Sequence, residues 1–259
     1  MTRRTFIWVV AGSFVCGAVN ASPRWSVSGR EPDVALAEGA RLHRFTVTGE
    51  GRVDFQVVSF SAARCSLRVV DQPARGAAGT LGEAMPRLHA IAGVNGGFFT
   101  PQFEPLGLVV SQGKRAGVWQ RSSLLGGLVM VKKGRLMLLW RDEFQDGQGI
   151  SELLQAGPRL VNHGAAVAGL ETGRNRPRTF IATDNEGHWL LGIAQSTSLA
   201  GLSQILVTPD LLPGFEVDRA LNFDGGRSTG LWLRTMNGET LYEEEISTVR
   251  NFVAIVPRG

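Results

Sequence analysis

The feature that most constrains the fold is a short apolar run that ends in an acid and a glycine pair, at residues 220–226. An apolar run of this length predicts a buried strand, and the glycines predict a tight turn directly after it. Asp224 then lies at the carboxyl end of the strand and faces the turn, and Asn222 alternates onto the same side. Gly225 and Gly226 leave their backbone N–H groups uncovered, because they have no side chain.

A base and two hydroxyls follow this turn directly, at Arg227, Ser228 and Thr229. A carboxylate, an amide, backbone donors, a guanidinium and hydroxyls therefore converge within a few residues. That combination of groups suits an anionic substrate that is rich in hydroxyls. The structural alternative is a turn that Asp224 only caps, by accepting backbone N–H bonds.

A second stretch has the same design, because residues 91–94 are apolar, Asn95 follows them, and the glycine pair 96–97 comes next. We expect the strand ends that carry Asn95 and Asp224 to meet at one edge or cleft, since ligand sites gather where loops leave a sheet. The loop after the glycine pair carries Glu104. A lone glutamate in a loop is usually solvated, but the position of Glu104 between this turn and the next strand makes it a candidate second carboxylate.

Five blocks of the sequence, in their order and spacing, resemble the phosphodiester glycosidase family. They are NGGFF at 95–99, PLGLVVSQGK at 105–114, QAGPRLVNHG at 155–164, RPRTFIATDNEGHWLLGIA at 176–194 and ALNFDGGRSTGLWL at 220–233. The resemblance covers residues 53–256. The last block departs from the family's usual DGG-Gly-Ser-Ser pattern at Arg227 and Thr229, which bears on the detailed substrate more than on the family.

The resemblance implies hydrolysis of a sugar-1-phosphodiester at the glycosidic carbon, which releases a free sugar and a phosphomonoester. Asp224 would be the base or nucleophile, and Glu104 a second acid or base. Arg178, which matches the family's Pro-Arg-Thr block, would clamp the phosphate, because a guanidinium offers planar paired donors. The other predicted binding residues, which would hold sugar hydroxyls or stabilise phosphate oxygens, are Asn95, Gly96, Gly97, Asn222, Gly225, Gly226, Arg227, Ser228 and Thr229.

Two alternative functions stay open at this point. One is a phosphodiesterase that cuts the P–O bond and releases a sugar phosphate, and the other is a glycan-binding envelope protein without turnover. The sequence predicts no cofactor and no metal site, because the four histidines are scattered and form no HxH or HExxH pattern. The expected partner is a sugar phosphate or an envelope glycan, and no pattern specifies an oligomeric state.

The first 21 residues predict a cleaved export signal. Arg3 and Arg4 give a basic start, residues 6–19 are apolar but too short for a stable membrane anchor, and Ala21 fits a cleavage site. The opening also resembles a twin-arginine signal, and an uncleaved N-terminal anchor is the alternative. We therefore expect a periplasmic or secreted protein whose mature part, residues 22–259, is one phosphodiester glycosidase-like domain without a stable membrane span.

The charge of the chain argues against a nucleic-acid partner. The formal net charge is +4, it falls to +2 without the predicted signal, and no run of lysine or arginine is present. Cys65 is the one cysteine of the predicted mature chain, so no internal disulfide is expected and stability must come from the core.

The predicted fold class is α+β, a single domain with a large mixed β-sheet, several hairpins and few helices. Hairpins are predicted around residues 132–134 and 237–238. Helices are predicted at residues 80–89, with a capping box at the start, and at residues 199–206. We also expect a helical turn at 151–155, a hairpin turn at 184–187, and a surface leader at 22–38.

Overall fold

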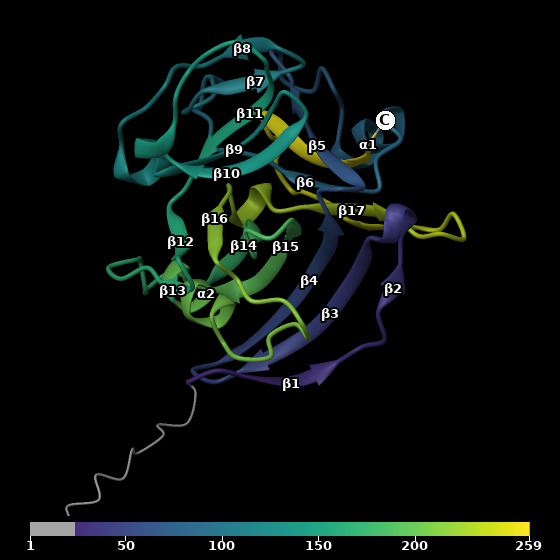
Figure 1. Cartoon of the computed structure of the whole chain (residues 1–259), viewed down its shortest axis with the longest axis vertical. Helices are drawn as coiled ribbons and strands as arrows, with labels where there is room; N and C mark the ends of the chain where they lie inside the picture. The colour runs from purple at the N-terminus through teal and green to yellow at the C-terminus, as the bar shows by residue number, and fades with distance from the viewer. Residues whose placement is uncertain (1–23, 259) are drawn as a thin grey trace, which may run out of the picture.

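The computed structural model describes residues 24–258, which form three β-sheets with two α-helices (Figure 1). The predicted export signal at residues 1–21 lies outside the described residues. Sheet I contains β1 (Ser26–Arg30), β2 (Val34–Ala35), β3 (Arg41–Thr48), β4 (Arg52–Ser61), β12 (Arg159–Asn162), β13 (Ala165–Ala166), β14 (Arg176–Thr183), β15 (His188–Thr197) and β16 (Arg219–Asn222). Its order in space is β1-β3-β4-β15-β14-β16-β12-β13, with β2 paired to β3.

The other two sheets have five strands each. Sheet II contains β7 (Val109–Ser111), β8 (Lys114–Ala116), β9 (Gly127–Lys132), β10 (Arg135–Trp140) and β11 (Ile150–Ala156), in the order β10-β9-β11-β7-β8. Sheet III contains β5 (Cys65–Asp71), β6 (Ala92–Asn95), β17 (Leu231–Arg234), β18 (Thr240–Glu243) and β19 (Asn251–Pro257), in the order β18-β17-β6-β19-β5. The helices are α1 (Leu81–Arg87) and α2 (Leu199–Leu206), and short 3-10 turns lie at Ala37–Gly39, Ser123–Leu125, Arg141–Glu143 and Gly226–Ser228.

One central core holds the three sheets together (Figure 1). Ile193 of sheet I, Leu154 of sheet II and Val253 of sheet III all belong to it and are fully buried. Helix α2 covers the opposite face of sheet I with residues such as Leu202, and α1 covers the opposite face of sheet III with residues such as Met85. Burying one such side chain contributes about 1.5–3 kcal/mol, so the core can stabilise the fold without a disulfide.

The structure confirms the α+β class, the single domain, the hairpins and the two predicted helices. Helix α1 begins after Thr80, whose hydroxyl accepts the N–H of Glu83, while the Glu83 carboxylate accepts the N–H of Thr80 at 2.8 Å. This reciprocal capping box satisfies two backbone donors at the start of the helix, as its sequence pattern predicts.

Three elements differ from their prediction. The strands divide among three sheets instead of one, and their pairs are antiparallel rather than mixed. Residues 151–155 belong to strand β11 and not to a helical turn, because β11 pairs with β9 and β7 and buries both faces, which removes the alternation typical of a strand. The predicted surface leader includes the strands β1 and β2, which pair with β3.

Candidate functional site

The ends of β6 and β16 meet where sheets III and I come together. The N–H of Asp224, just after β16, donates to the carbonyl oxygen of Gly96 at 2.9 Å. The side-chain amide of Asn95, the last residue of β6, donates to the carbonyl oxygen of Asp224 at 2.8 Å. The two glycine turns, which are separated by more than a hundred residues in sequence, are therefore direct neighbours, as expected from their strand-end positions.

Asn95 is a buried link between segments. Its side-chain oxygen accepts the hydroxyl of Thr179 on β14 at 2.6 Å and the N–H of Gly230 at 3.3 Å. Only 1% of Asn95 is exposed. A buried amide whose oxygen is shared in this way fixes the relative position of the loops, so Asn95 holds the two turns together.

The first glycine pair packs against Asn251 at the start of β19. Gly96 N–H donates to the backbone oxygen of Asn251 at 2.8 Å, and Gly97 N–H donates to the Asn251 side-chain oxygen at 2.7 Å. A Cβ atom on Gly96 would lie 2.0 Å from that side-chain oxygen, so this position requires glycine. These two backbone donors are therefore already used within the protein.

The second glycine pair shapes the turn that carries Asp224. Gly225 N–H donates to the Asp224 carboxylate at 2.8 Å, and a Cβ on Gly225 would come within 2.8 Å of the Pro177 carbonyl oxygen. Gly226 has a φ of +64° and opens the 3-10 turn Gly226–Ser228. Close approach to β14 and a left-handed conformation thus explain why two glycines follow the acid.

Asp224 is a half-buried carboxyl group with an altered acidity. Burial raises the pKa of Asp224 above its ordinary value, while hydrogen bonds from Ser228 and Gly225 and the charge of Arg176 oppose that rise. A carboxyl group whose pKa is raised by its surroundings can exchange a proton closer to neutral pH. Of the predicted site residues, Asp224 therefore has the properties expected of an acid or base.

The Arg178 side chain runs beside this turn, with its Cδ atom 3.6 Å from the position that a Cβ on Gly225 would occupy, but its guanidinium is bound to other groups. Neighbouring residues on a strand point to opposite faces, and Thr179 points toward Asn95. Arg178 is 8% exposed and donates to the carbonyl oxygens of Thr197 and Arg174 at 3.0 and 2.8 Å. It also contacts the Glu171 carboxylate at 3.3 Å.

Two other arginines lie beside the turn. The Cδ atom of Arg176 is 3.8 Å from the position that a Cβ on Gly226 would occupy, and Arg176 is exposed. Arg227 is also exposed, with its Nε donating to the Ser247 hydroxyl at 3.4 Å. A bulge between residues 176 and 178 shifts the strand register, so alternation in the sequence did not predict which arginine keeps an exposed guanidinium beside the turn.

Glu104 remains in a loop outside this set of contacts. Its side chain is 71% exposed, and its charged partner within residues 24–258 is Arg250 at 3.9 Å. Arg250 itself forms a closer pair with Asp71 at 2.8 Å. The structure therefore does not bring Glu104 into contact with Asp224.

Three buried polar atoms around the turns lack a hydrogen-bond partner among the described residues. They are the side-chain oxygen of Asn222, the hydroxyl of Thr229 and the side-chain nitrogen of Asn251. The amide of Asn222 is directed to the Gly157 carbonyl oxygen at 3.0 Å. Buried polar groups are nearly always satisfied in folded proteins, so a cluster of unsatisfied ones indicates a place for water or a bound polar molecule.

Sequence reasoning did not single out Glu243, a carboxylate at the end of β18 that two glutamines from other strands hold in place. Gln56 on β4 donates to one oxygen of Glu243 at 2.7 Å, and Gln195 on β15 donates to the other. Glu243 lies opposite Leu231, the residue after Gly230, whose N–H is bound by Asn95. Three consecutive glutamates, at residues 243–245, are typical of a solvated surface. Only the contacts with Gln56 and Gln195 distinguish Glu243 from the two glutamates that follow it.

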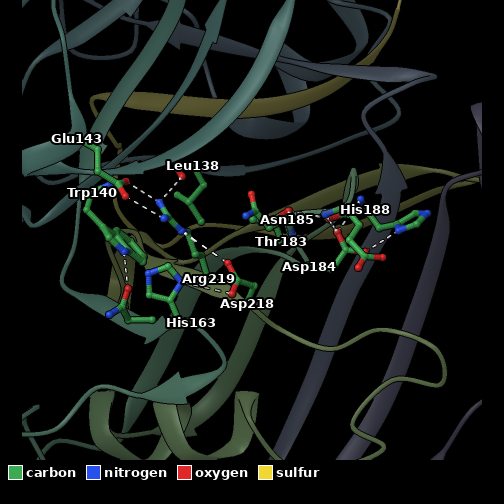
Figure 2. Close-up of polar contacts among 12 residues, drawn as sticks. Leu138, Trp140, Glu143, His163, Thr183, Asp184, Asn185, His188, Asp218 and Arg219 are labelled. Atoms are coloured by element: carbon green, nitrogen blue, oxygen red, sulfur yellow. Dashed lines mark hydrogen bonds and ion pairs between the residues drawn. The ribbon is translucent and has the colours of Figure 1, made fainter.

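A separate polar cluster lies at the opposite end of β14 and β16 (Figure 2). Arg219 donates to both oxygens of Glu143, at 2.6 and 2.9 Å. Asp184 contacts the His188 ring at 2.6 Å and accepts the N–H groups of residues 186 and 188. The predicted role of Asp184 as a turn residue is confirmed by these contacts. His163 lies 3.7 Å from Asp218.

The fold and the paired turns define an antiparallel β-sheet protein with a polar site where two sheets meet. The family model for phosphodiester glycosidases matches residues 89–256, so the chain belongs to the phosphodiester glycosidase family. Among residues 24–258, no three His, Cys, Asp or Glu side chains gather as they would around a metal ion. No helix in the same range has the length and apolarity to cross a membrane.

Two of the solved structures that resemble this fold illustrate the likeness. The catalytic domain of zebrafish N-acetylglucosamine-1-phosphodiester alpha-N-acetylglucosaminidase, auto-inhibited by its pro-peptide, matches with a TM-score of 0.61 and 16% identity, over 92% of this chain and 85% of that one. A hypothetical protein from Synechocystis matches with a TM-score of 0.59 and 18% identity, over 88% of this chain and 64% of that one. At these identities the likeness concerns the fold. Comparison with curated protein sequences gives no significant match.

Proposed function

We propose that this protein is an exported hydrolase that cleaves a sugar-1-phosphodiester at the glycosidic bond and releases a free sugar and a phosphomonoester. Membership of the phosphodiester glycosidase family supports the reaction class. The observation that carries the proposal for this chain is the half-buried Asp224, whose pKa burial raises, in a glycine turn beside Arg176. Asp224 can exchange a proton, and Arg176 is a cation beside it. Both would therefore lie where an anionic substrate reacts.

Asp224 acts as base or nucleophile in this proposal. As a base, it takes a proton from water while the water oxygen bonds to the anomeric carbon. The bond from that carbon to the phosphate oxygen breaks, and the phosphomonoester leaves with the electron pair. Arg176 and Arg227 balance the charge on the leaving phosphate, a stabilisation that is strongest where water is excluded.

Glu243 is the second carboxylate that we propose for this site. The two glutamine amides orient its carboxylate, as supporting groups do in built catalytic sites. Glycoside hydrolysis generally uses a pair of carboxyl groups. Glu104, which the sequence favours for that role, is exposed and pairs with Arg250, so it serves as the comparison residue in the experiments.

The test uses a sugar-1-phosphodiester in ¹⁸O-labelled water. Label in the released sugar indicates cleavage at the glycosidic carbon, whereas label in a released phosphate indicates a phosphodiesterase. Binding without any product would support the glycan-binding alternative and exclude the hydrolase. The Asp224→Asn variant, measured in parallel, controls for contaminating activity.

Export forms a separate part of the proposal. Fusing residues 1–30 to a folded reporter should deliver the reporter to the periplasm, and replacing Arg3 and Arg4 with lysine should abolish delivery. Delivery of unfolded reporters alone would favour the ordinary secretory route, and a reporter that stays in the cytoplasm would contradict export.

A further inference from the structure

Three polar side chains form a hydrogen-bonded row on sheet I, and none of them belongs to the contacts around Asp224. His43 on β3 stands in the middle of the row. Its Nδ1 atom lies 2.8 Å from the Oδ1 atom of Asp33, and its Nε2 atom lies 2.8 Å from the Oγ atom of Ser59 on β4. An acid, an imidazole and a hydroxyl in this order are the arrangement that activates a serine as a nucleophile.

The backbone holds the acid of this row against the imidazole. Asp33 directly precedes β2, which runs beside β3 (Figure 1) and whose first residue pairs with Leu42. On the other side of Asp33, the N–H of Glu31 donates to the carbonyl oxygen of Arg44 at 3.0 Å. These two attachments lie on either side of His43 in β3, so they place Asp33 beside the ring.

The hydrogen bonds assign the roles of the two ring nitrogens. An ionised carboxylate can only accept a hydrogen bond, so Nδ1 of the neutral His43 ring carries the hydrogen that Asp33 accepts. The lone pair of Nε2 then accepts the hydroxyl hydrogen of Ser59. The His43 side chain is 13% exposed, and in this tautomer it can remove the proton of Ser59 as the oxygen attacks an electrophile.

The surroundings of Ser59 suit an ester with a short acyl chain. Ser59 is partly exposed, and it lies directly opposite Arg41 on β3 and Leu190 on β15. Residues that lie directly opposite each other share one face of a sheet. Leu190 and Val57, which pack in one apolar cluster, are each 1% exposed. The surface beside Ser59 is therefore closed to a long acyl chain.

We propose that Ser59 and His43, positioned by Asp33, form a second catalytic site that hydrolyses short-chain carboxylic esters. The Ser59 oxygen bonds to the carbonyl carbon while its proton passes to His43 Nε2, and the electron pair of the C=O bond moves to the carbonyl oxygen. The C=O bond then re-forms and the bond to the alcohol oxygen breaks, so that the alcohol leaves with the proton from His43.

Water completes the reaction at the acylated Ser59. The water oxygen bonds to the acyl carbon and gives a proton to His43. The bond from that carbon to the Ser59 oxygen breaks, and the Ser59 oxygen takes the proton back from His43. The products are a carboxylic acid and an alcohol, and the protein returns to its starting state.

Arg41 is the group that stabilises the negative charge on the carbonyl oxygen. The backbone of Ser59 pairs with a strand on each side, so a side chain must supply the positive charge. Arg41 is exposed on the same face as Ser59. Arg41→Ala should slow ester hydrolysis by about 10-fold, which is less than the loss of a preorganised donor in a water-excluded site.

The first experiment treats the full-length protein with a fluorophosphonate probe, which bonds to an activated serine with loss of fluoride. Mass spectrometry should locate the label on Ser59, and His43→Gln should slow labelling by ~10²-fold or more because the general base is lost. The matched control is His188→Gln. The His188 ring lies 2.6 Å from Asp184 but has no hydroxyl partner within residues 24–258, so this variant should label at the wild-type rate.

Two variants of Asp33 separate positioning from packing. In Asp33→Asn the new amide can donate to Nδ1, which favours the tautomer that cannot accept the Ser59 proton. Labelling should then slow at an unchanged melting temperature, since Asp33 is 43% exposed. Asp33→Glu restores a carboxylate and should label faster than Asp33→Asn. Labelling of Asp33→Asn at the wild-type rate would overturn the role assigned to Asp33.

The second experiment measures kcat/KM for p-nitrophenyl acetate and p-nitrophenyl octanoate. The acetate should react faster, and Ser59→Ala should lower its hydrolysis by ~10²-fold or more. Ser59→Ala removes one neutral hydrogen bond, so the variant should fold. Asp224→Asn should keep the ester activity, because it changes the other site. A label on another residue, no label at all, or ester hydrolysis that survives in Ser59→Ala would overturn the proposal and leave the proposed phosphodiester activity untouched.

Discussion

The two ends of strands β14 and β16 contain similar residue types, but their carboxyl groups differ in the partners that they contact. At one end, Asp224 stands in a glycine turn where burial raises its pKa and where neighbouring polar atoms lack partners. At the other end, the carboxylates of Asp184 and Glu143 each have close partners (Figure 2). The buried atoms Asp218 Oδ2 and Arg219 Nε have no hydrogen bond there, but they lie 3.7 Å apart as an ion pair.

The two ends therefore differ in the partners of their charged groups more than in their residue types. The Asp184 end is the richer in histidine and acid, yet its contacts satisfy the turn and the Arg219 side chain. A carboxylate that already accepts such bonds is stabilised in its charged form. At Asp224, burial outweighs the hydrogen bonds from Ser228 and Gly225 and raises the pKa, which is why we propose this residue as the group that changes charge.

The largest effect is expected for Asp224→Asn compared with Asp184→Asn. Removing the base from the turn should lower turnover of a sugar-1-phosphodiester by ~10²-fold or more, with a nearly unchanged melting temperature. Asp184→Asn should leave the turnover of the folded protein unchanged. If the melting temperature of Asp224→Asn falls by several degrees and its activity follows the folded fraction, Asp224 is a turn residue.

The next comparison separates the two candidate second carboxylates. Glu243→Gln keeps the shape of the side chain but removes its charge, and we expect turnover to fall by ~10²-fold. Glu104→Gln changes an exposed side chain and should stay within about twofold of the wild-type turnover. The opposite order of effects would return the role of second carboxylate to Glu104, as the sequence predicts.

The arginines of β14 give a smaller effect. Arg176→Ala should raise KM for phosphodiester substrates by about 10-fold or more relative to neutral glycosides, because one charge-assisted hydrogen bond is lost. Arg178→Ala should instead lower the melting temperature by about 5 °C, since it leaves its buried partners unsatisfied. A selective loss of phosphodiester activity in Arg178→Ala, at unchanged stability, would restore the clamp that the sequence resemblance implies.

The smallest effect concerns stability as a function of pH. The hydrogen bond from Arg219 holds the pKa of Glu143 below its ordinary value, so Glu143 stabilises the fold above its unfolded pKa and loses that contribution as the pH falls. Burial raises the pKa of Asp224, so ionising this carboxyl group destabilises the fold. That loss of stability appears as the pH rises through the pKa of Asp224 in the folded state. Urea unfolding should therefore find Glu143→Gln less stable, and Asp224→Asn more stable, than wild type at neutral pH.

Both differences should be about 1 kcal/mol or less, because Glu143 is partly screened by solvent. Both should shrink as the pH falls, because the cost of Asp224 is absent below its unfolded pKa and the contribution of Glu143 is lost as the pH falls through its lowered folded pKa. A stability difference that is constant with pH in either variant would mean that the substituted group does not titrate differently on folding.

Much of the fold was predictable because its signals are local. The capping box at Thr80 specifies the start of α1, and the glycine pairs mark turns after apolar strands. The prediction for residues 151–155 failed because strand β11 is buried on both faces, including its polar residues Glu152 and Gln155, and only its pairing with two neighbours decides its conformation.

The candidate site was predictable only in part, for the same reason. The position of Asp224 at a strand end is a local property, and the pattern indicated it. The direction of Arg178 depends on a bulge and on the surrounding segments, and the importance of Glu243 depends on Gln56 and Gln195 from other strands.

The sequence by itself determined where the strands end and where glycine is needed, because both depend on neighbouring residues and backbone sterics. It also determined the family, through five blocks in a fixed order. Only the tertiary structure decided which side chains share the site. Hydrogen bonding and burial depend on distances between segments that are far apart in the chain, and the packing of sheet I against sheet III brings the Asp224 turn beside Asn95 and Gly96.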